Sequence, residues 1–83
     1  MLICRVIGSV ISSRKNEKLT GSKFLIVQQD GKNEPFVAVD NVGAGANETV
    51  LVVQGSGARI ACHENMPVDA AIVGIIDEGT YCP

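Results

Sequence analysis

Residues 39–59 read VDNVGAGANETVLVVQGSGAR and place two glycine-rich turns on either side of one short apolar strand. The first turn spans Gly43–Asn47 and the second spans Gly55–Gly57. Glycine in a turn usually supplies a positive φ or lets another backbone come close. Because one strand separates the turns, we expect them at opposite ends of a small sheet. The stretch contains no paired carboxylates and no metal-ligand cluster, so it indicates close packing between chains more strongly than it indicates a catalytic site.

Apolar, β-branched segments on both sides of this stretch predict an all-β (mainly β) fold. Pro35 opens the third of these segments, and Asp30-Gly31 before it is typical of a hairpin turn. Gly8 and Gly74 lie inside the first and last segments, where a sheet needs to bend. The five predicted strands are Leu2–Ile11, Lys23–Gln29, Phe36–Val42, Glu48–Gln54 and Ala70–Asp77.

One short helix is predicted between the fourth and fifth strands, from about Gly57 to His63. The hydroxyl of Ser56 is expected to cap it by accepting a free N–H of the first turn. Five short, curved antiparallel strands with one helix close most economically into a small five-stranded OB-like barrel. We expect a single domain over residues 1–83, with the barrel in 1–77 and a C-terminal tail in 78–83.

The composition favours an oligomer. The chain has 83 residues, of which 46% are hydrophobic, and its mean hydropathy is +0.23. A domain this small buries only about 60–65% of its unfolded surface. The longest apolar run is far shorter than the ~20 residues of a membrane helix, so we expect no membrane partner. Apolar side chains in excess of a small core are typical of burial between subunits.

Charge and aromatic content argue against nucleic-acid binding. Seven basic and nine acidic residues give a net charge of −2, whereas nucleic-acid binders carry a basic field that neutralises phosphates. Phe24, Phe36 and Tyr81 are the only aromatic residues and form no stacking platform. The N-terminal segment reads as a first strand, since Arg5 lies inside the apolar run rather than before it.

The candidate metal ligands are Cys4, Cys62, His63 and Cys82, and their spacing does not suit a zinc site. Structural zinc sites use close pairs such as C-x₂₋₄-C, whereas Cys62 and His63 are adjacent and would point about 100° apart on a helix. The same adjacency argues against a Cys–His catalytic dyad. An odd number of cysteines fits a reducing cytosol. We therefore expect no cofactor, and metal analysis of the purified protein would test the remaining redox or metal role.

Both glycine turns are candidate anion sites. Phosphate-binding loops lead into a helix, whereas the turn at Gly43–Gly45 leads into a strand. A weak anion site at Ser56 and Arg59 is the better hypothesis, because a hydroxyl and a guanidinium meet at a helix start. The competing interpretation is a helix cap plus an intersubunit salt bridge, in which Asp69 or Asp77 pairs with Arg59. Asp40 and Glu48, at strand ends, show no acid/base pairing in sequence.

Taken together, a set of motifs over residues 1–77 closely resembles the bacterial microcompartment vertex proteins, the ethanolamine-utilisation and carboxysome type of small shell protein. Asn47 stands where glycine is common in that family, Gly57 where a second serine is common, and Ser13 where threonine is frequent. Asparagine tolerates the left-handed conformation, so Asn47 suits the same turn. The matching residues are Met1, Val6-x-Gly8-x-Val10, Leu19-x-Gly21-x-Lys23, Val37-Ala38-x-Asp40-x-Val42-Gly43-Ala44-Gly45, Glu48-x-Val50-Leu51, Gly55-Ser56-x-Ala58-Arg59, Pro67-x-Asp69 and Gly74-Ile75-Ile76-Asp77.

The resemblance implies a structural, non-catalytic homopentamer at the five-fold vertices of a cytoplasmic protein shell, beside hexameric shell proteins. The alternative is a small β-barrel module that binds a ligand or nucleic acid, which predicts a basic or aromatic face. Residues expected at the subunit interface or five-fold axis are Gly43, Ala44, Gly45, Asn47, Glu48, Gly55, Ser56, Gly57, Arg59, Asp69 and Asp77.

Overall fold

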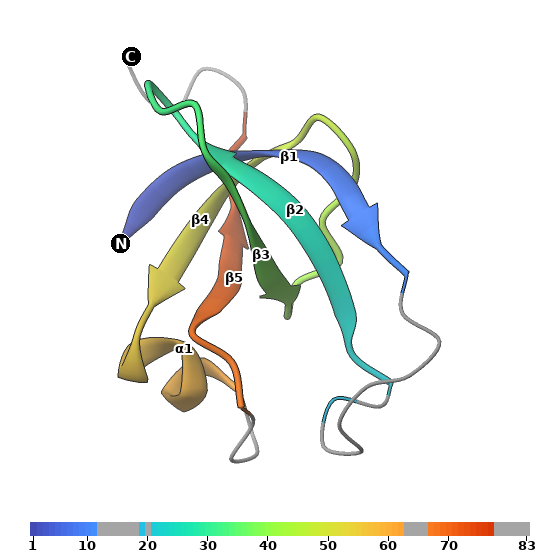
Figure 1. Cartoon of the computed structure of the whole chain (residues 1–83), viewed down its shortest axis with the longest axis vertical. Helices are drawn as coiled ribbons and strands as arrows, with labels where there is room; N and C mark the ends of the chain where they lie inside the picture. Colours follow the sequence, from blue (N-terminus) through green and yellow to red (C-terminus); the bar gives the residue numbers. More distant parts are fainter. Residues whose placement is uncertain (12–18, 20, 63–66, 78–83) are drawn as a thin grey trace.

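The computed structural model describes residues 1–11, 19, 21–62 and 67–77, and it shows a closed five-stranded barrel with one short helix (Figure 1). The strands lie around the barrel in the order β1-β2-β3-β5-β4. The mainly β fold and the element order predicted from the sequence are confirmed. The elements are β1 (Leu2–Val10), β2 (Lys23–Gln29), β3 (Pro35–Asp40), β4 (Thr49–Gln54), α1 (Ser56–Ala61) and β5 (Ala70–Ile75).

The strand pairing is antiparallel except at one seam. β3 and β5 run parallel and share only two residue pairs, Val39 with Ala71 and Asp40 with Ile72. The prediction of five antiparallel strands is therefore wrong. The reason is geometric, because an odd number of strands cannot alternate in direction all the way around a closed barrel. One parallel pair is unavoidable, and here it falls between β3 and β5.

The barrel interior is filled by small and medium aliphatic side chains. Successive residues of a strand point to opposite faces, and accordingly Val50 and Val52 are fully buried while Leu51 between them is only half-buried. The inward side chains form one apolar cluster to which the β3–β4 loop contributes Ala44. The cluster comprises Cys4, Val6, Leu25, Val27, Ala38, Ala44, Val50, Val52, Ala70 and Ile72.

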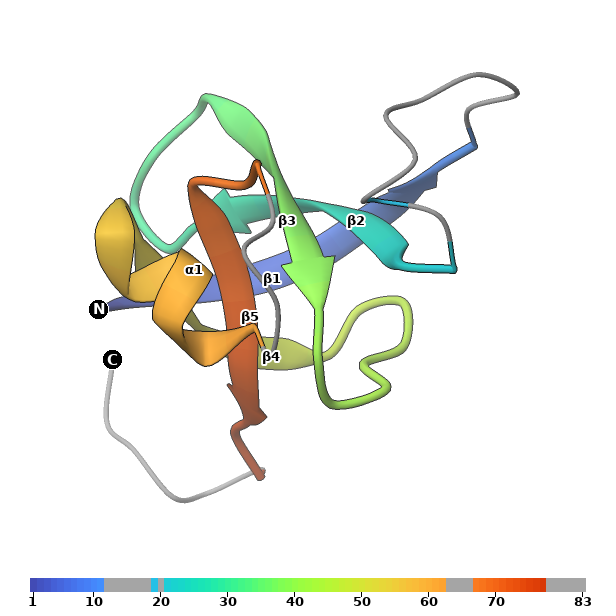
Figure 2. The same ribbon diagram turned by 90° about the horizontal axis from the view of Figure 1, so that it is seen from below.

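A second, smaller cluster lies outside the barrel wall, beneath α1. Ala58 of the helix and Cys62 after it pack on Val39 and Ala71, which are the two wall residues of the parallel seam. Phe24, Leu19, Val53, Ala61 and Val68 complete the rim of this cluster. Figure 2 shows α1 lying along the end of the barrel beside β5. Thus the helix covers one part of the outer wall.

Both strand glycines coincide with irregularities in the sheet, as the sequence predicts. The β1–β2 register shifts between Val6 and Gly8. The β4–β5 register shifts between Leu51 and Val52, opposite Gly74 and Ile72. Bulges bend a strand and increase its twist, which helps five short strands to close into a barrel.

The structure corrects the expected ends of the elements. The helix N-cap is Gly55, no side chain makes a capping hydrogen bond, and Ser56 is the first helical residue, so the predicted Ser56 cap is wrong. Helix α1 ends at Ala61, and His63 lies outside the described residues, as do most of the loop 12–21 and the predicted tail 78–83. No helix in the described ranges is long and apolar enough to cross a membrane.

Candidate assembly site: the two glycine turns

The two glycine turns lie at opposite ends of β4, as expected. The first is the loop 41–48, which joins β3 to β4, and the second is Gly55, which joins β4 to α1. In Figure 1 the first loop lies at the upper right of the barrel and α1 lies at the lower left. The chemistry of each turn follows from the groups that its backbone contacts.

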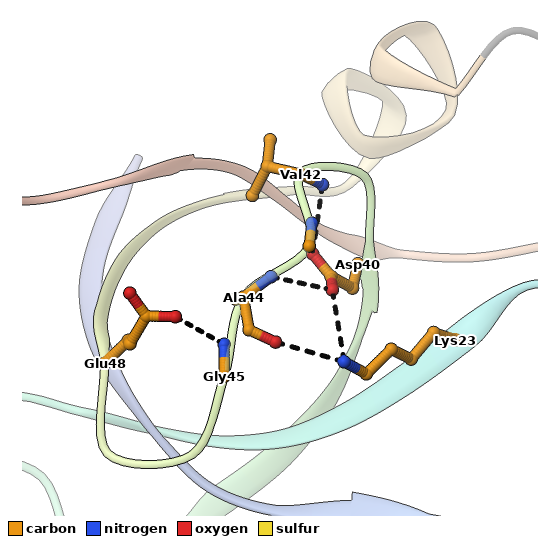
Figure 3. A network of polar contacts seen from close by, with 7 residues as sticks. Lys23, Asp40, Val42, Ala44, Gly45 and Glu48 are labelled. Atoms are coloured by element: carbon orange, nitrogen blue, oxygen red, sulfur yellow. Dashed lines mark hydrogen bonds and ion pairs between the residues drawn. The ribbon is translucent and has the colours of Figure 1, made fainter.

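Asp40, the last residue of β3, organises the first loop. Its Oδ1 accepts hydrogen bonds from the N–H groups of Val42 and Gly43, both at 3.0 Å. Its Oδ2 accepts the N–H of Ala44 at 2.9 Å (Figure 3). The side chain is 1% exposed. Hydrogen bonds to an ionised carboxylate are stronger than neutral ones, so Asp40 fixes three consecutive peptide groups of the turn.

Lys23 and Glu48 hold the same loop from either side. The Nζ of Lys23 donates to the carbonyl of Ala44 at 3.1 Å and lies 3.9 Å from Oδ2 of Asp40. Lys23 reaches both groups because the β2–β3 register places it directly opposite Asp40. The carboxylate of Glu48 accepts the N–H of Gly45, and the backbone N–H of Glu48 donates to the carbonyl of Gly45 at 3.2 Å. The loop is therefore held by side chains from the adjacent ends of β2 and β3 and by its own residue Glu48.

The conformation of the loop explains two of its small residues. Gly43 has φ of 79° and Asn47 has φ of 68°, and both lie in the left-handed region that glycine and asparagine tolerate. The predicted compatibility of Asn47 with this turn is confirmed. The N–H of Asn47 donates to the carbonyl of Val6 at 2.9 Å, and the N–H of Val6 donates to the carbonyl of Glu48 at 3.0 Å. The far end of the loop is thus joined to β1.

The second turn depends on the backbone of Gly55. Its φ of 68° and ψ of −143° describe a conformation that other residues rarely adopt. Its N–H donates to the carbonyl of Asp69 at 2.8 Å, and its carbonyl accepts the N–H of Ala58 at 3.1 Å. The turn therefore ties the start of α1 to the residue that precedes β5.

The polar side chains of the second turn face solvent. Ser56 and Arg59 are exposed and three residues apart on α1, so they share one face of the helix. Across the described ranges no ion pair joins Arg59 to Asp69. Asp69 contacts the second turn through its backbone carbonyl, which accepts the N–H of Gly55. A pairing of Arg59 across a subunit boundary stays a prediction, as does the weak anion site.

The structure therefore divides the predicted site residues between the two ends of the barrel. Gly43, Ala44, Gly45, Asn47 and Glu48 lie in the first loop, and Gly55, Ser56, Gly57, Arg59 and Asp69 surround the second turn. Asp77 follows β5 at the first end, where the N–H of Ile76 donates to the carbonyl of Thr49 at 2.8 Å. The predicted set omits Asp40 and Lys23. The signal for Asp40 was present, since an Asp immediately before a glycine turn often accepts its backbone N–H groups.

The two described cysteines do not form a common site. Cys4 is buried in the barrel core, where burial raises the pKa of its thiol, whereas Cys62 is buried beneath α1. Both are free thiols. Among the residues with a described position, no three His, Cys, Asp or Glu side chains form a group that could hold a metal. His63 and Cys82, the other candidate ligands, lie outside those residues.

Known proteins are similar to this chain over most of its length. A family model described as ethanolamine utilisation protein EutN/carboxysome matches residues 1–77. The carboxysome shell vertex protein CcmL of Thermosynechococcus vestitus is 49% identical over an alignment that covers 93% of this chain and 84% of the relative. The microcompartment shell vertex protein EutN of Escherichia coli is 39% identical, with 94% and 88% covered.

Solved structures agree with these relatives. The pentameric shell protein of the RMM microcompartment superposes with a TM-score of 0.90 and 36% identity, over 100% of this chain and 98% of that one. Gloeobacter violaceus CcmL gives a TM-score of 0.85 and 47% identity, with 93% and 86% covered. All four names describe shell proteins, and they do not favour the alternative of a ligand- or nucleic-acid-binding module. The chain belongs to the EutN/CcmL family of microcompartment shell vertex proteins.

Proposed function

We propose that five copies of this chain form a ring that occupies a five-fold vertex of a bacterial microcompartment shell in the cytoplasm, beside hexameric shell proteins. One observation carries the proposal: the whole chain superposes on a pentameric shell protein with a TM-score of 0.90. A second pentameric shell protein, GrpN of Rhodospirillum rubrum, superposes with a TM-score of 0.80 and 44% identity. The role is structural, and we assign no reaction to the chain.

Within this proposal, the glycine turns lie where subunits meet or surround the five-fold axis. The support is local. The first loop satisfies its own backbone through Asp40, Lys23 and Glu48, so it needs no bound ligand to hold its shape. Its exposed positions include two of the smallest residues, Gly43 and Ala46. Small side chains on an ordered backbone allow a neighbouring chain to approach closely.

The mass of the purified protein tests the proposal. Size-exclusion chromatography with multi-angle light scattering is expected to give five times the 8.7 kDa chain mass. A single-chain mass at micromolar concentration would contradict the ring. The vertex role has a separate test, which is co-expression with hexameric shell proteins from the same cell. Six-fold units alone tile a flat sheet, so closed particles are expected only when the vertex protein is present.

A further inference from the structure

An apolar face covers the outer wall of the barrel over β1, β2 and β3. The strand registers align Gly8, Ile26 and Val37 across these strands. Ile26 leans over Gly8, because a Cβ built on Gly8 would lie 3.5 Å from Cδ1 of Ile26. Ile7, in the bulge, and Val37 are 48% and 46% exposed. We define the β2 face as Ile7, Gly8, Val10, Ile26 and Val37.

A second apolar face lies over β1, β4 and β5. Here the registers align Ile3, Leu51 and Gly74. Leu51 leans over Gly74 in the same manner, since a Cβ built on Gly74 would lie 3.5 Å from Cδ1 of Leu51. Ile3 and Leu51 are half-buried in the single chain. We define the β4 face as Ile3, Leu51, Val73 and Gly74.

The exposure of these faces contrasts with the part of the wall that α1 covers. Val37 and Val39 point to the same side of β3, yet Val39 is 2% exposed and Val37 is 46% exposed. The difference arises because α1 and Phe24 pack over Val39. Beyond the edge of the helix the outer wall is still apolar, as a buried surface would be. None of the described residues covers it there.

A groove lined by both apolar and polar residues lies between the two faces on β1. It has a volume of about 250 Å³, and Ile3 and Ile7 line it on either side of Arg5. The turn Asp30–Lys32 forms its border, held by the N–H of Asp30, which donates to the carbonyl of Ile3 at 3.1 Å. Arginine is among the residues that are enriched at protein–protein interfaces.

We infer that the β2 face of one copy packs against the β4 face of the next copy in the ring. This inference rests on the proposed pentamer and names its contact surfaces. A ring requires two different complementary surfaces on each subunit, whereas one self-complementary surface produces only a dimer. The β2 and β4 faces meet this requirement, because they lie on different walls and share only β1 (Figure 1). In this arrangement the small residues of the glycine turns let neighbouring chains come close together. The aliphatic faces supply the apolar area that the contact buries.

Acidic substitutions on each face test this assignment. Val37→Asp places a charge on the β2 face, and Leu51→Glu places one on the β4 face while its aliphatic stem still covers Gly74. Each variant alone is expected to have the mass of a single chain by light scattering. An equimolar mixture is expected to contain a two-chain species, because each variant retains one intact face that is complementary to its partner's. Asn33→Asp adds the same charge at an exposed position between β2 and β3, outside both faces and both glycine turns; it is the control and should keep the wild-type mass.

Each result has a definite meaning. If Val37→Asp or Leu51→Glu keeps a five-chain mass, or if Asn33→Asp dissociates as they do, the assignment is overturned. A two-chain species formed by one variant alone would show a self-complementary interface and also overturn it, as would a mixture that stays monomeric. Circular dichroism verifies folding, and Ile7→Asp replaces Val37→Asp if that variant does not fold. A wild-type protein that is itself monomeric would instead contradict the proposed function.

Discussion

Among substitutions of polar residues, replacement of Asp40 is expected to cause one of the largest losses in the free energy of unfolding. In Asp40→Ala the N–H groups of Val42, Gly43 and Ala44 lose their acceptors at once. Val42 and Gly43 are exposed and Ala44 is buried, so water can replace the carboxylate at two of the three groups. The third N–H stays in the barrel core without a partner.

The expected loss in the free energy of unfolding follows from these contacts. A hydrogen bond to a charged group contributes about 1.5–3 kcal/mol, and an unsatisfied buried donor costs about 1–3 kcal/mol. The ion pair with Lys23 adds at most about 1 kcal/mol, because the Lys23 side chain is 57% exposed. With water compensating for the two exposed groups, we expect Asp40→Ala to lose about 2–4 kcal/mol. Asp40→Asn keeps one acceptor oxygen and should lose about half as much.

Urea denaturation followed by circular dichroism measures this loss. All variants are compared at one protein concentration, because the stability of an oligomer depends on concentration. Glu34→Ala is the control, since it removes the same charge from an exposed side chain. The assignment of Asp40 as the organiser of the loop is refuted if Asp40→Ala stays within about 0.5 kcal/mol of wild type, the range of ordinary surface substitutions.

Three further predictions concern single positions. Gly55→Val should destabilise the fold by about 1–3 kcal/mol in the same assay, because valine is strained at φ of 68° and ψ of −143°; an unchanged midpoint would contradict this. Asn47→Gly should change stability by less than about 1 kcal/mol, whereas Asn47→Val should lose more, since φ of 68° disfavours a β-branched residue; equal effects of the two would be inconsistent with this reason. The Cys4 thiol should resist iodoacetamide in the native protein. Because burial raises its pKa above the ordinary 9.0, the unfolded chain ionises first, and the free energy of unfolding should fall as the pH rises past 9.0. Labelling of native Cys4 as rapid as that of the urea-unfolded chain would refute this assignment.

Local patterns in the sequence predicted most of the fold. β2 has the predicted ends, and β4 begins one residue after the predicted Glu48. The expected bends at Gly8 and Gly74 coincide with register shifts. These features depend on alternation, β-branching and glycine within a few residues, which one sequence displays directly.

The missed features depend on residues that are distant along the chain. The parallel seam follows from closing an odd number of strands, and no local pattern indicates where that seam falls. Lys23 joins the first loop only because the β2–β3 register places it opposite Asp40, and that register is decided by the whole segment 30–34. Ser56 was a reasonable cap by residue type, but Gly55 adopts the conformation that starts the helix. The apolar faces were predicted only as an excess in composition, without positions.

The short β3–β5 seam also determines how the barrel opens. With two residue pairs, it is the part of the sheet that local fluctuations separate most readily, and amide hydrogen exchange would detect it at a lower opening free energy than that of global unfolding. Asp40 belongs to this seam and also holds the first loop. Each opening of the seam therefore releases the carboxylate from the N–H groups of the loop. The amides of Val42 and Ala44 should exchange in step with the amide of Asn41, which donates to the carbonyl of Ile72 across the seam, so that the loop and the seam behave as one cooperative unit.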